Sequence, residues 1–390
     1  MMSRLACLRF TALGLFCWAL GGCALLGGVK VEPVATSFQK PSNVAAYIAV
    51  SDGKEPIDEL TADNFKIYEN EQPIGAEASE QKLLDKDQVA YHHVLLLVDV
   101  SGQSEPSATE SLQKGIANFV DKVRRSESVS VFAFDGRPGV RSIGEFSRQA
   151  SGGAPEARAL SGLDSQDSSR NLNGAVVDAL KQLDEKLSAS SKPVRVGALV
   201  IFTRGADLAG RVSSDALYKA LSDSKSDVLA LGVAEEAGPT LGDLGKSGTV
   251  HAQSADSIPI GFEEIASKVV ALYQKYYLLS YCSPARAGKR RLRVEVKYAD
   301  VKGAEKHGDF TADFDASGFG PGCNPDTPPH FSAQSKSAAS EPTSAAKASV
   351  KGDASPAKPA GKADKPSTNP PPSDDDNNVV PPPKKPGYSQ

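Results

Sequence analysis

Cysteine thiols offer the most readily interpreted chemistry in this sequence. Of the five cysteines, Cys7, Cys17 and Cys23 lie within the first 23 residues, and Cys282 and Cys323 follow much later. The later two form an even pair, and paired thiols in an oxidising compartment form disulfides. Spacing alone does not show that their Cα atoms come within the ~7 Å that a disulfide requires. We therefore predict a disulfide between Cys282 and Cys323, with two buried thiols as the alternative.

An apolar leader ends at Cys23. Residues 1–9 carry two arginines and no acid, residues 10–20 are almost entirely apolar, and residues 20–22 read Leu-Gly-Gly. These are the parts of an export signal, which is too short to span a membrane. Together with Cys23, the last residues resemble the lipobox of bacterial lipoproteins, a family in which this cysteine becomes the first residue of the mature protein and carries acyl chains. An ordinary secretory signal with an incidental cysteine is the alternative.

The lipoprotein resemblance implies a signal peptide over residues 1–22 and a lipid-anchored protein of the cell envelope. Attachment to the membrane would then rest on the acyl chains, which contribute ~0.8 kcal/mol per buried methylene. Residue 24 is alanine rather than aspartate, and under the retention rule familiar from enteric bacteria this favours the outer membrane. The chain carries 44 lysines and arginines against 48 acids, without a basic stripe, so we expect no nucleic acid as a partner.

Changes in composition divide the mature chain into segments. We expect a linker over residues 23–40, and two β-rich segments at 41–90 and 276–323 that pack together into one small sandwich around an inserted domain. Residues 324–390 hold 14 of the 26 prolines and very few large apolar side chains. Such a segment cannot bury enough apolar surface to offset its ordering entropy, so we predict a disordered tail. A spacer, a docking strand and an inert tail all fit this composition.

The inserted residues 91–275 alternate between two patterns. Segments with helical apolar spacing separate four continuous apolar runs, which are typical of strands buried on both faces of a sheet. The four runs are His93–Asp99, Val129–Phe134, Val196–Thr203 and Val228–Val233. This alternation predicts a doubly wound α/β domain with a parallel sheet, in which ligands bind at the carboxyl ends of the strands. Asp99-Val100-Ser101 lies at such an end.

Several of these segments together resemble a von Willebrand factor A domain. They are Val94–Ser101, Val129–Phe134, Leu172–Val176 and Leu199–Gly205. The upstream stretch Leu60–Glu69 is similar to the β segment that precedes the A domain in a class of exported bacterial proteins. The resemblance covers about residues 40–320 and implies a Rossmann-like A domain inserted in, or flanked by, a small β-sandwich domain.

Members of that family bind Mg²⁺ through three loops, and this chain departs from the family pattern in each. In the first loop Asp99 and Ser101 match, but Gln103 stands where a second serine is expected. Arg170 stands at the threonine of the second loop, and Arg204 at the aspartate of the third. A divalent cation needs several oxygen ligands, and arginine stays protonated and cannot coordinate a metal. We therefore expect no metal and no other cofactor.

The second loop offers one partial substitute, because Ser169 or Ser168 could supply a hydroxyl after a small shift. The two arginines allow two interpretations. In one, Arg204 or Arg170 pairs with Asp99, supplies the missing positive charge and meets an acidic residue of a protein partner. In the other, the pair only stabilises a vestigial site.

The family resemblance favours a function in protein–protein binding or scaffolding at the envelope. A structural envelope lipoprotein with a wall-spanning tail is one alternative, and an exported hydrolase is another. The sequence shows no Gly-x-Ser-x-Gly motif and no recognisable nucleophile–base pair, so we do not expect an enzyme.

Overall fold

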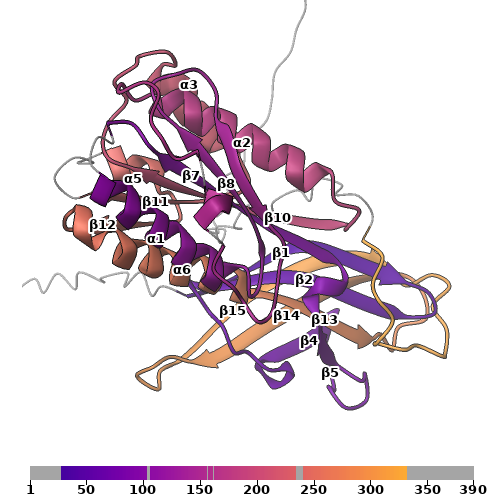
Figure 1. The fold of residues 1–390 in the computed structure, drawn as a ribbon. Helices are drawn as coiled ribbons and strands as arrows, with labels where there is room; N and C mark the ends of the chain where they lie inside the picture. Colours follow the sequence, from indigo (N-terminus) through magenta and orange to yellow (C-terminus); the bar gives the residue numbers. More distant parts are fainter. Residues whose placement is uncertain (1–27, 103–105, 156, 161, 234–239, 332–390) are drawn as a thin grey trace, which may run out of the picture. The chain divides into compact units, whose positions relative to one another are not determined.

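The computed structural model describes most of the chain (Figure 1). The described residues are 28–102, 106–155, 157–160, 162–233 and 240–331. The predicted signal peptide, the predicted lipid anchor Cys23, the loop residue Gln103 and residues 332–390 of the predicted tail lie outside them. No helix among the described residues is long and apolar enough to cross a membrane.

A six-stranded sheet forms the centre of residues 90–274. Its strands are β7 (Ala90–Asp99), β8 (Ser128–Phe134), β9 (Arg141–Phe146), β10 (Val194–Thr203), β11 (Asp227–Val233) and β12 (Gly248–Ala252). They lie in the order β12-β11-β10-β7-β8-β9, and every neighbouring pair is parallel except β8–β9. The predicted parallel sheet is confirmed, with an antiparallel edge strand that the apolar runs did not indicate.

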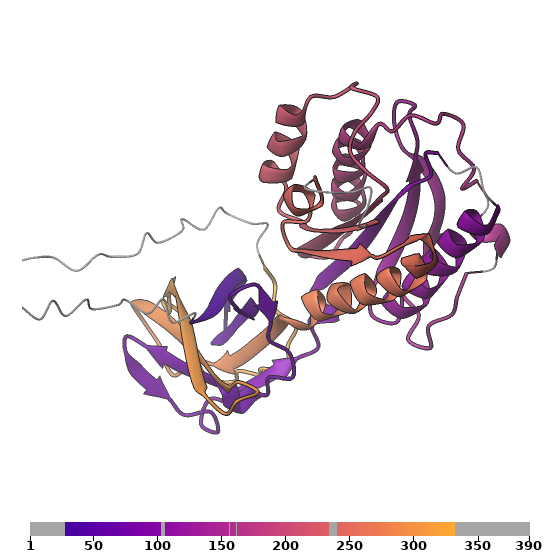
Figure 2. The same cartoon turned by 90° about the vertical axis from the view of Figure 1, so that its left-hand side faces the viewer.

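Helices cover both faces of this sheet (Figures 1 and 2). The helices are α1 (Pro106–Val123) and α6 (Ile258–Gln274) on one face, and α2 (Leu172–Ser188), α3 (Ser214–Asp223) and α5 (Thr240–Leu244) on the other. In β7, Val94 and Leu96 point into the cluster below α1 and α6, whereas Leu95 and Leu97 point towards α2. Both faces are buried, which is why the run is apolar throughout. Short 3₁₀ turns occur at Ala62–Asn64, Lys86–Gln88, Ala157–Leu160 and Ala255–Ser257.

Two antiparallel sheets build the predicted sandwich from both ends of the described chain. The first has the order β1-β2-β13-β6 with β3 paired to β2, and the second has the order β15-β14-β4-β5. Their strands are β1 (Val29–Gln39), β2 (Asn43–Asp52), β3 (Glu55–Pro56), β4 (Phe65–Glu69), β5 (Gln72–Ile74), β6 (Lys82–Leu84), β13 (Tyr276–Cys282), β14 (Lys289–Ala299) and β15 (Glu305–Asp315). Alternate residues such as Val44 and Ile48 of β2 meet Leu292 and Val294 of β14 in one apolar core.

Part of the segment predicted as a linker is instead strand β1. It pairs with β2 over ten residue pairs, from Val29 with Asp52 to Gln39 with Asn43, with an irregularity near Pro33. Val29 and Val31 are buried in the sandwich core, and Phe38 packs against it. The strand escaped prediction because only its first residues alternate clearly between buried and exposed positions.

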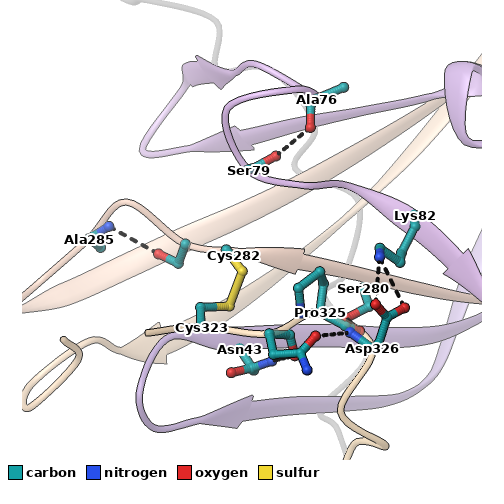
Figure 3. The surroundings of a disulfide bond; sticks show 12 residues. Asn43, Ala76, Ser79, Lys82, Ser280, Cys282, Ala285, Cys323, Pro325 and Asp326 are labelled. Carbon is teal, nitrogen blue, oxygen red and sulfur yellow. Dashed lines mark hydrogen bonds and ion pairs between the residues drawn. A yellow bond between two sulfur atoms is a disulfide. The ribbon is translucent and has the colours of Figure 1, made fainter. Parts of the chain in front are cut away.

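The first residues of the predicted tail are also fixed, beginning at the disulfide between Cys282 and Cys323, whose Cα atoms lie 5.8 Å apart. This confirms the predicted pairing (Figure 3). Beyond it, the Ser280 hydroxyl donates to the Pro325 carbonyl at 2.8 Å, and the Lys82 ammonium contacts the Asp326 carboxylate at 2.9 Å. Residues 324–331 therefore form an ordered strap on the first sheet, and the predicted tail boundary at residue 324 is too early.

Candidate functional site

The side chain of Asp99 is the centre of the candidate site at the carboxyl end of β7. It is completely buried, and both carboxylate oxygens accept hydrogen bonds. Oδ1 accepts from the Ser101 backbone N–H at 2.9 Å and from the Ser101 hydroxyl at 2.5 Å. Oδ2 accepts from the Thr203 hydroxyl at 3.2 Å and from the Arg204 backbone N–H at 3.0 Å. A buried carboxylate requires such partners because burial removes its hydration.

Arg170 provides the remaining hydrogen bond and the compensating charge. Its Nε lies 2.6 Å from Asp99 Oδ2 and 3.1 Å from the Ser101 hydroxyl, and its side chain is 13% exposed. Its Nη1 donates to the Ala206 carbonyl at 3.2 Å. The Arg170 carbonyl in turn accepts from the backbone N–H groups of Leu208 and Ala209. One arginine therefore neutralises Asp99 and orders the loop that follows β10.

Arg204 lies in the same loop but has a different environment. Its backbone binds Asp99, as described, while its half-buried side chain makes no ion pair with any described residue. Its Nε is buried and has no hydrogen-bond partner among these residues. Of the two arginines that the sequence placed near Asp99, Arg170 is the one whose guanidinium pairs with it.

Ser169, the hydroxyl that the sequence offered for the second loop, is bonded to Asp167 instead of Asp99. The hydroxyl and backbone N–H of Ser169 both donate to Asp167 Oδ1, at 2.8 and 2.9 Å. These hydrogen bonds lower the pKa of Asp167. The nearby Asp207 accepts from the backbone N–H groups of Asn173, in the first turn of α2, and of Gly210.

This donor set does not fit a resident Mg²⁺ ion. A hard divalent cation needs several free oxygen ligands, but both oxygens of Asp99 are occupied and the Arg170 guanidinium lies against one of them. In the described part of the chain no three His, Cys, Asp or Glu side chains are grouped to hold a metal. A cation could coordinate Asp99 only after Arg170 had moved away.

The structure contains a serine–histidine contact that the sequence analysis missed. His93 Nε2 lies 2.8 Å from the Ser130 hydroxyl, and His93 Nδ1 lies 2.9 Å from the Tyr91 hydroxyl. His93 and Ser130 are both buried within the sheet, and burial lowers the pKa of His93 to about 4. No substrate can reach this serine, and the imidazole is oriented by a phenol rather than a carboxylate. We interpret the contact as structural. From the sequence, only the expectation that β7 and β8 are neighbouring strands could have indicated the contact between His93 and Ser130.

Comparison with known proteins finds similarity among solved structures only. No family model matches the chain, and no curated protein matches its sequence. Among solved structures it is similar to the ArnB paralog VWA2 from Sulfolobus acidocaldarius, with 14% identity over 74% of each chain and a TM-score of 0.35. It is also similar to a von Willebrand factor type A protein from Catenulispora acidiphila, with 11% identity over 73% of this chain and 72% of that one and a TM-score of 0.39.

A third similar structure is the manganese-loaded TRAP protein of Plasmodium vivax, with 12% identity over 61% of this chain and 97% of that one and a TM-score of 0.36. Residues 90–274 have an α/β fold with a mostly parallel sheet, combined with two antiparallel sheets.

Proposed function

We propose that this protein is an envelope-anchored module for protein–protein binding or scaffolding, and that its A-like domain works without a metal ion. In this proposal a lipid on Cys23 anchors the protein in the outer membrane. The proposal assigns no catalysis to the domain. Ser101, the serine beside Asp99, is hydrogen-bonded to that carboxylate and to Arg170, and no described histidine bonds to it.

The observation that carries the proposal is the Arg170–Asp99 pair. The carboxyl ends of parallel strands are where such folds bind ligands. At this edge a protein side chain supplies the positive charge that a bound cation would otherwise supply, at 2.6 Å from a fully buried carboxylate. A buried pair of this kind is costly to break, because removing one partner leaves an uncompensated charge. The edge is therefore preformed, which reduces the entropy lost when a partner binds.

The proposal can be tested by site-specific photo-crosslinking in isolated cell envelopes. Benzoylphenylalanine replaces Leu208, which is 67% exposed in the loop after β10, or Val301, which is fully exposed in the β14–β15 hairpin. We expect a discrete crosslinked protein from position 208, unchanged by EDTA, and none from position 301. Equal labelling from both positions, or a crosslink that disappears in EDTA, would contradict the proposal.

A further inference from the structure

The sandwich domain begins only a few residues after Cys23. Gly28 is the first described residue, and residues 24–27 read Ala-Leu-Leu-Gly, without a charged side chain. The five residue steps from Cys23 to Gly28 span at most about 18 Å, even when fully extended. If Cys23 carries the lipid, the end of the sandwich at which β1 begins must therefore lie close to the membrane surface.

Strands β1 and β15 run side by side in the same direction. Val29, at the start of β1, lies so close to Gly308 that a Cβ atom on this glycine would clash with the Val29 carbonyl oxygen. Towards the other end of both strands, the rings of Phe38 and Phe314 stack with their centroids 4.7 Å apart. Strand β1 therefore begins at the end of the sandwich where the β14–β15 hairpin turn lies (Figure 1).

The hairpin turn extends from this end about as far as Cys23 can. The last pair of strand residues in the hairpin, Ala299 with Glu305, lies three positions beyond the pair that contains Gly308. Three positions are about 10 Å along a strand, and the turn residues 300–304 extend further. Because Cys23 lies at most about 18 Å from Gly28, the turn can reach the membrane surface in which Cys23 would be anchored.

Val301 in this turn is more exposed than any other large apolar side chain that the structure describes. A single exposed valine is ordinary on a protein surface, so its position is the informative feature. The turn that carries it is well ordered, because the Asp300 carboxylate accepts from the backbone N–H groups of Lys302 and Ala304, both at 2.9 Å. These hydrogen bonds lower the pKa of Asp300 and hold its charge against the backbone. Val301 and the exposed Lys302 then form the tip.

We propose that this tip, Val301 with Lys302, inserts into the interface of the phospholipid membrane that carries the Cys23 lipid. The valine enters the apolar boundary, and the lysine ammonium stays among the lipid phosphates. Burial of a valine side chain favours insertion by about tenfold or more, and the lipid tether makes this second contact intramolecular. The inference rests on the anchor in the proposed function, and adds that the sandwich has a fixed orientation on the membrane.

A tryptophan at position 301 would report insertion directly. The chain has one tryptophan, Trp18 in the predicted signal peptide, so Val301→Trp gives the mature protein a single fluorophore. The acylated mature protein is reconstituted in vesicles of phosphatidylethanolamine and phosphatidylglycerol, with and without lipids brominated on their acyl chains. We expect the brominated lipids to quench most of the emission, and the emission maximum to shift to shorter wavelength, because an inserted ring leaves water.

Ala287→Trp is the matched control. Ala287 is exposed in the loop before β14, at the opposite end of this strand of eleven residues and about 33 Å or more from the tip. Brominated lipids should leave its emission unchanged. Melting temperatures close to that of the wild type establish that both variants are folded.

Hydrogen exchange tests the tip without a tryptophan, which itself favours membrane interfaces. Amide hydrogens of residues 300–304 should exchange more slowly in the acylated protein on vesicles than in soluble Cys23→Ser protein. Val301→Asp should abolish this difference, because a carboxylate opposes insertion into the apolar boundary.

Equal quenching at positions 301 and 287, or exchange at residues 300–304 that vesicles leave unchanged, would overturn the inference. Neither result touches the anchor, which mass spectrometry of the N-terminal peptide establishes, or the protein crosslink expected from position 208. An unacylated Cys23 would contradict the anchor and, with it, the hairpin contact. Insertion of the tip into lipid agrees with the absence of a crosslinked protein from position 301.

Discussion

Replacing Arg170 by threonine tests whether this arginine takes the place of a metal ion. Asp99 is fully buried, and Arg170 is the charged group paired with it. Removing one member of a buried ion pair costs about 3–5 kcal/mol, because the other charge is left uncompensated. We therefore expect Arg170→Thr to lower the free energy of unfolding by this amount in EDTA. Arg195→Thr, at an exposed position, should change it little.

The same experiment distinguishes loss of charge from loss of packing. Adding Asp99→Asn to Arg170→Thr removes the uncompensated carboxylate, so the double variant should be more stable than Arg170→Thr alone. A double variant as unstable as the sum of the two single variants would show that the pair contributes through packing only.

Divalent ions provide the second part of this test. The wild type should have the same melting temperature in millimolar Mg²⁺ and in excess EDTA. In the triple variant Gln103→Ser/Arg170→Thr/Arg204→Asp a cation can replace the guanidinium, and binding at a hundredfold excess over Kd stabilises by about 2.7 kcal/mol. For a domain of this size that is a rise of roughly 5–11 °C. Stabilisation of the unmodified protein by Mg²⁺ would refute the reasoning, since it requires a cation beside an intact Arg170–Asp99 pair.

Three further predictions concern other parts of the chain. Cys23→Ser should move the protein from the membrane fraction to the soluble exported fraction, and unchanged partitioning would exclude a lipid anchor. Cys323→Ser opens a loop of 41 residues, which costs about 4 kcal/mol by loop entropy; hydrogen exchange of residues 324–331 should increase, and unchanged protection would mean that side-chain contacts alone hold the strap. Burial lowers the pKa of His93 to about 4 from 6.5. The unfolded state therefore binds a proton before the folded state does, and up to about 3 kcal/mol of stability is lost as the pH falls from 6.5 to 4. Urea unfolding at pH 7 and pH 4.5 should show a smaller difference for His93→Gln than for the wild type, and an equal difference would place the acid sensitivity elsewhere.

Burial on both faces made the six-stranded sheet predictable. Strands such as β7 and β10 are apolar at nearly every position because helices cover both sides, and such runs are recognisable in a single sequence. The edge strand β9 is only partly buried and has no comparable pattern. Strand β1 was missed for a similar reason, since it contains Pro33 and a register irregularity that interrupts its alternation.

The ordered strap could not be predicted because the tail supplies mainly backbone atoms to it. The Asn43 amide, the Ser280 hydroxyl and the Ser37 hydroxyl donate to the carbonyls of Asn324, Pro325 and His330. Carbonyl groups are the same in every residue, so composition carries no trace of these contacts. A proline-rich stretch can therefore be ordered when a neighbouring sheet offers donors and a disulfide fixes one end.

The choice between Arg170 and Arg204 also depended on geometry that the sequence lacks. Both lie in loops at the carboxyl edge, and either could have reached Asp99. The conformation of the loop after β10 determines which arginine pairs with Asp99. The Arg204 backbone N–H donates to Asp99, while the Arg204 Nε has no partner among the described residues. The guanidinium that lies beside Asp99 Oδ2 is that of Arg170. The Arg170 guanidinium is part of the polypeptide, so every copy of the protein carries this positive charge beside Asp99. Binding at such an edge would respond to ionic strength through screening and not to the concentration of divalent ions. Under the proposed function, partner binding at the envelope would then not depend on chelators or metal supply.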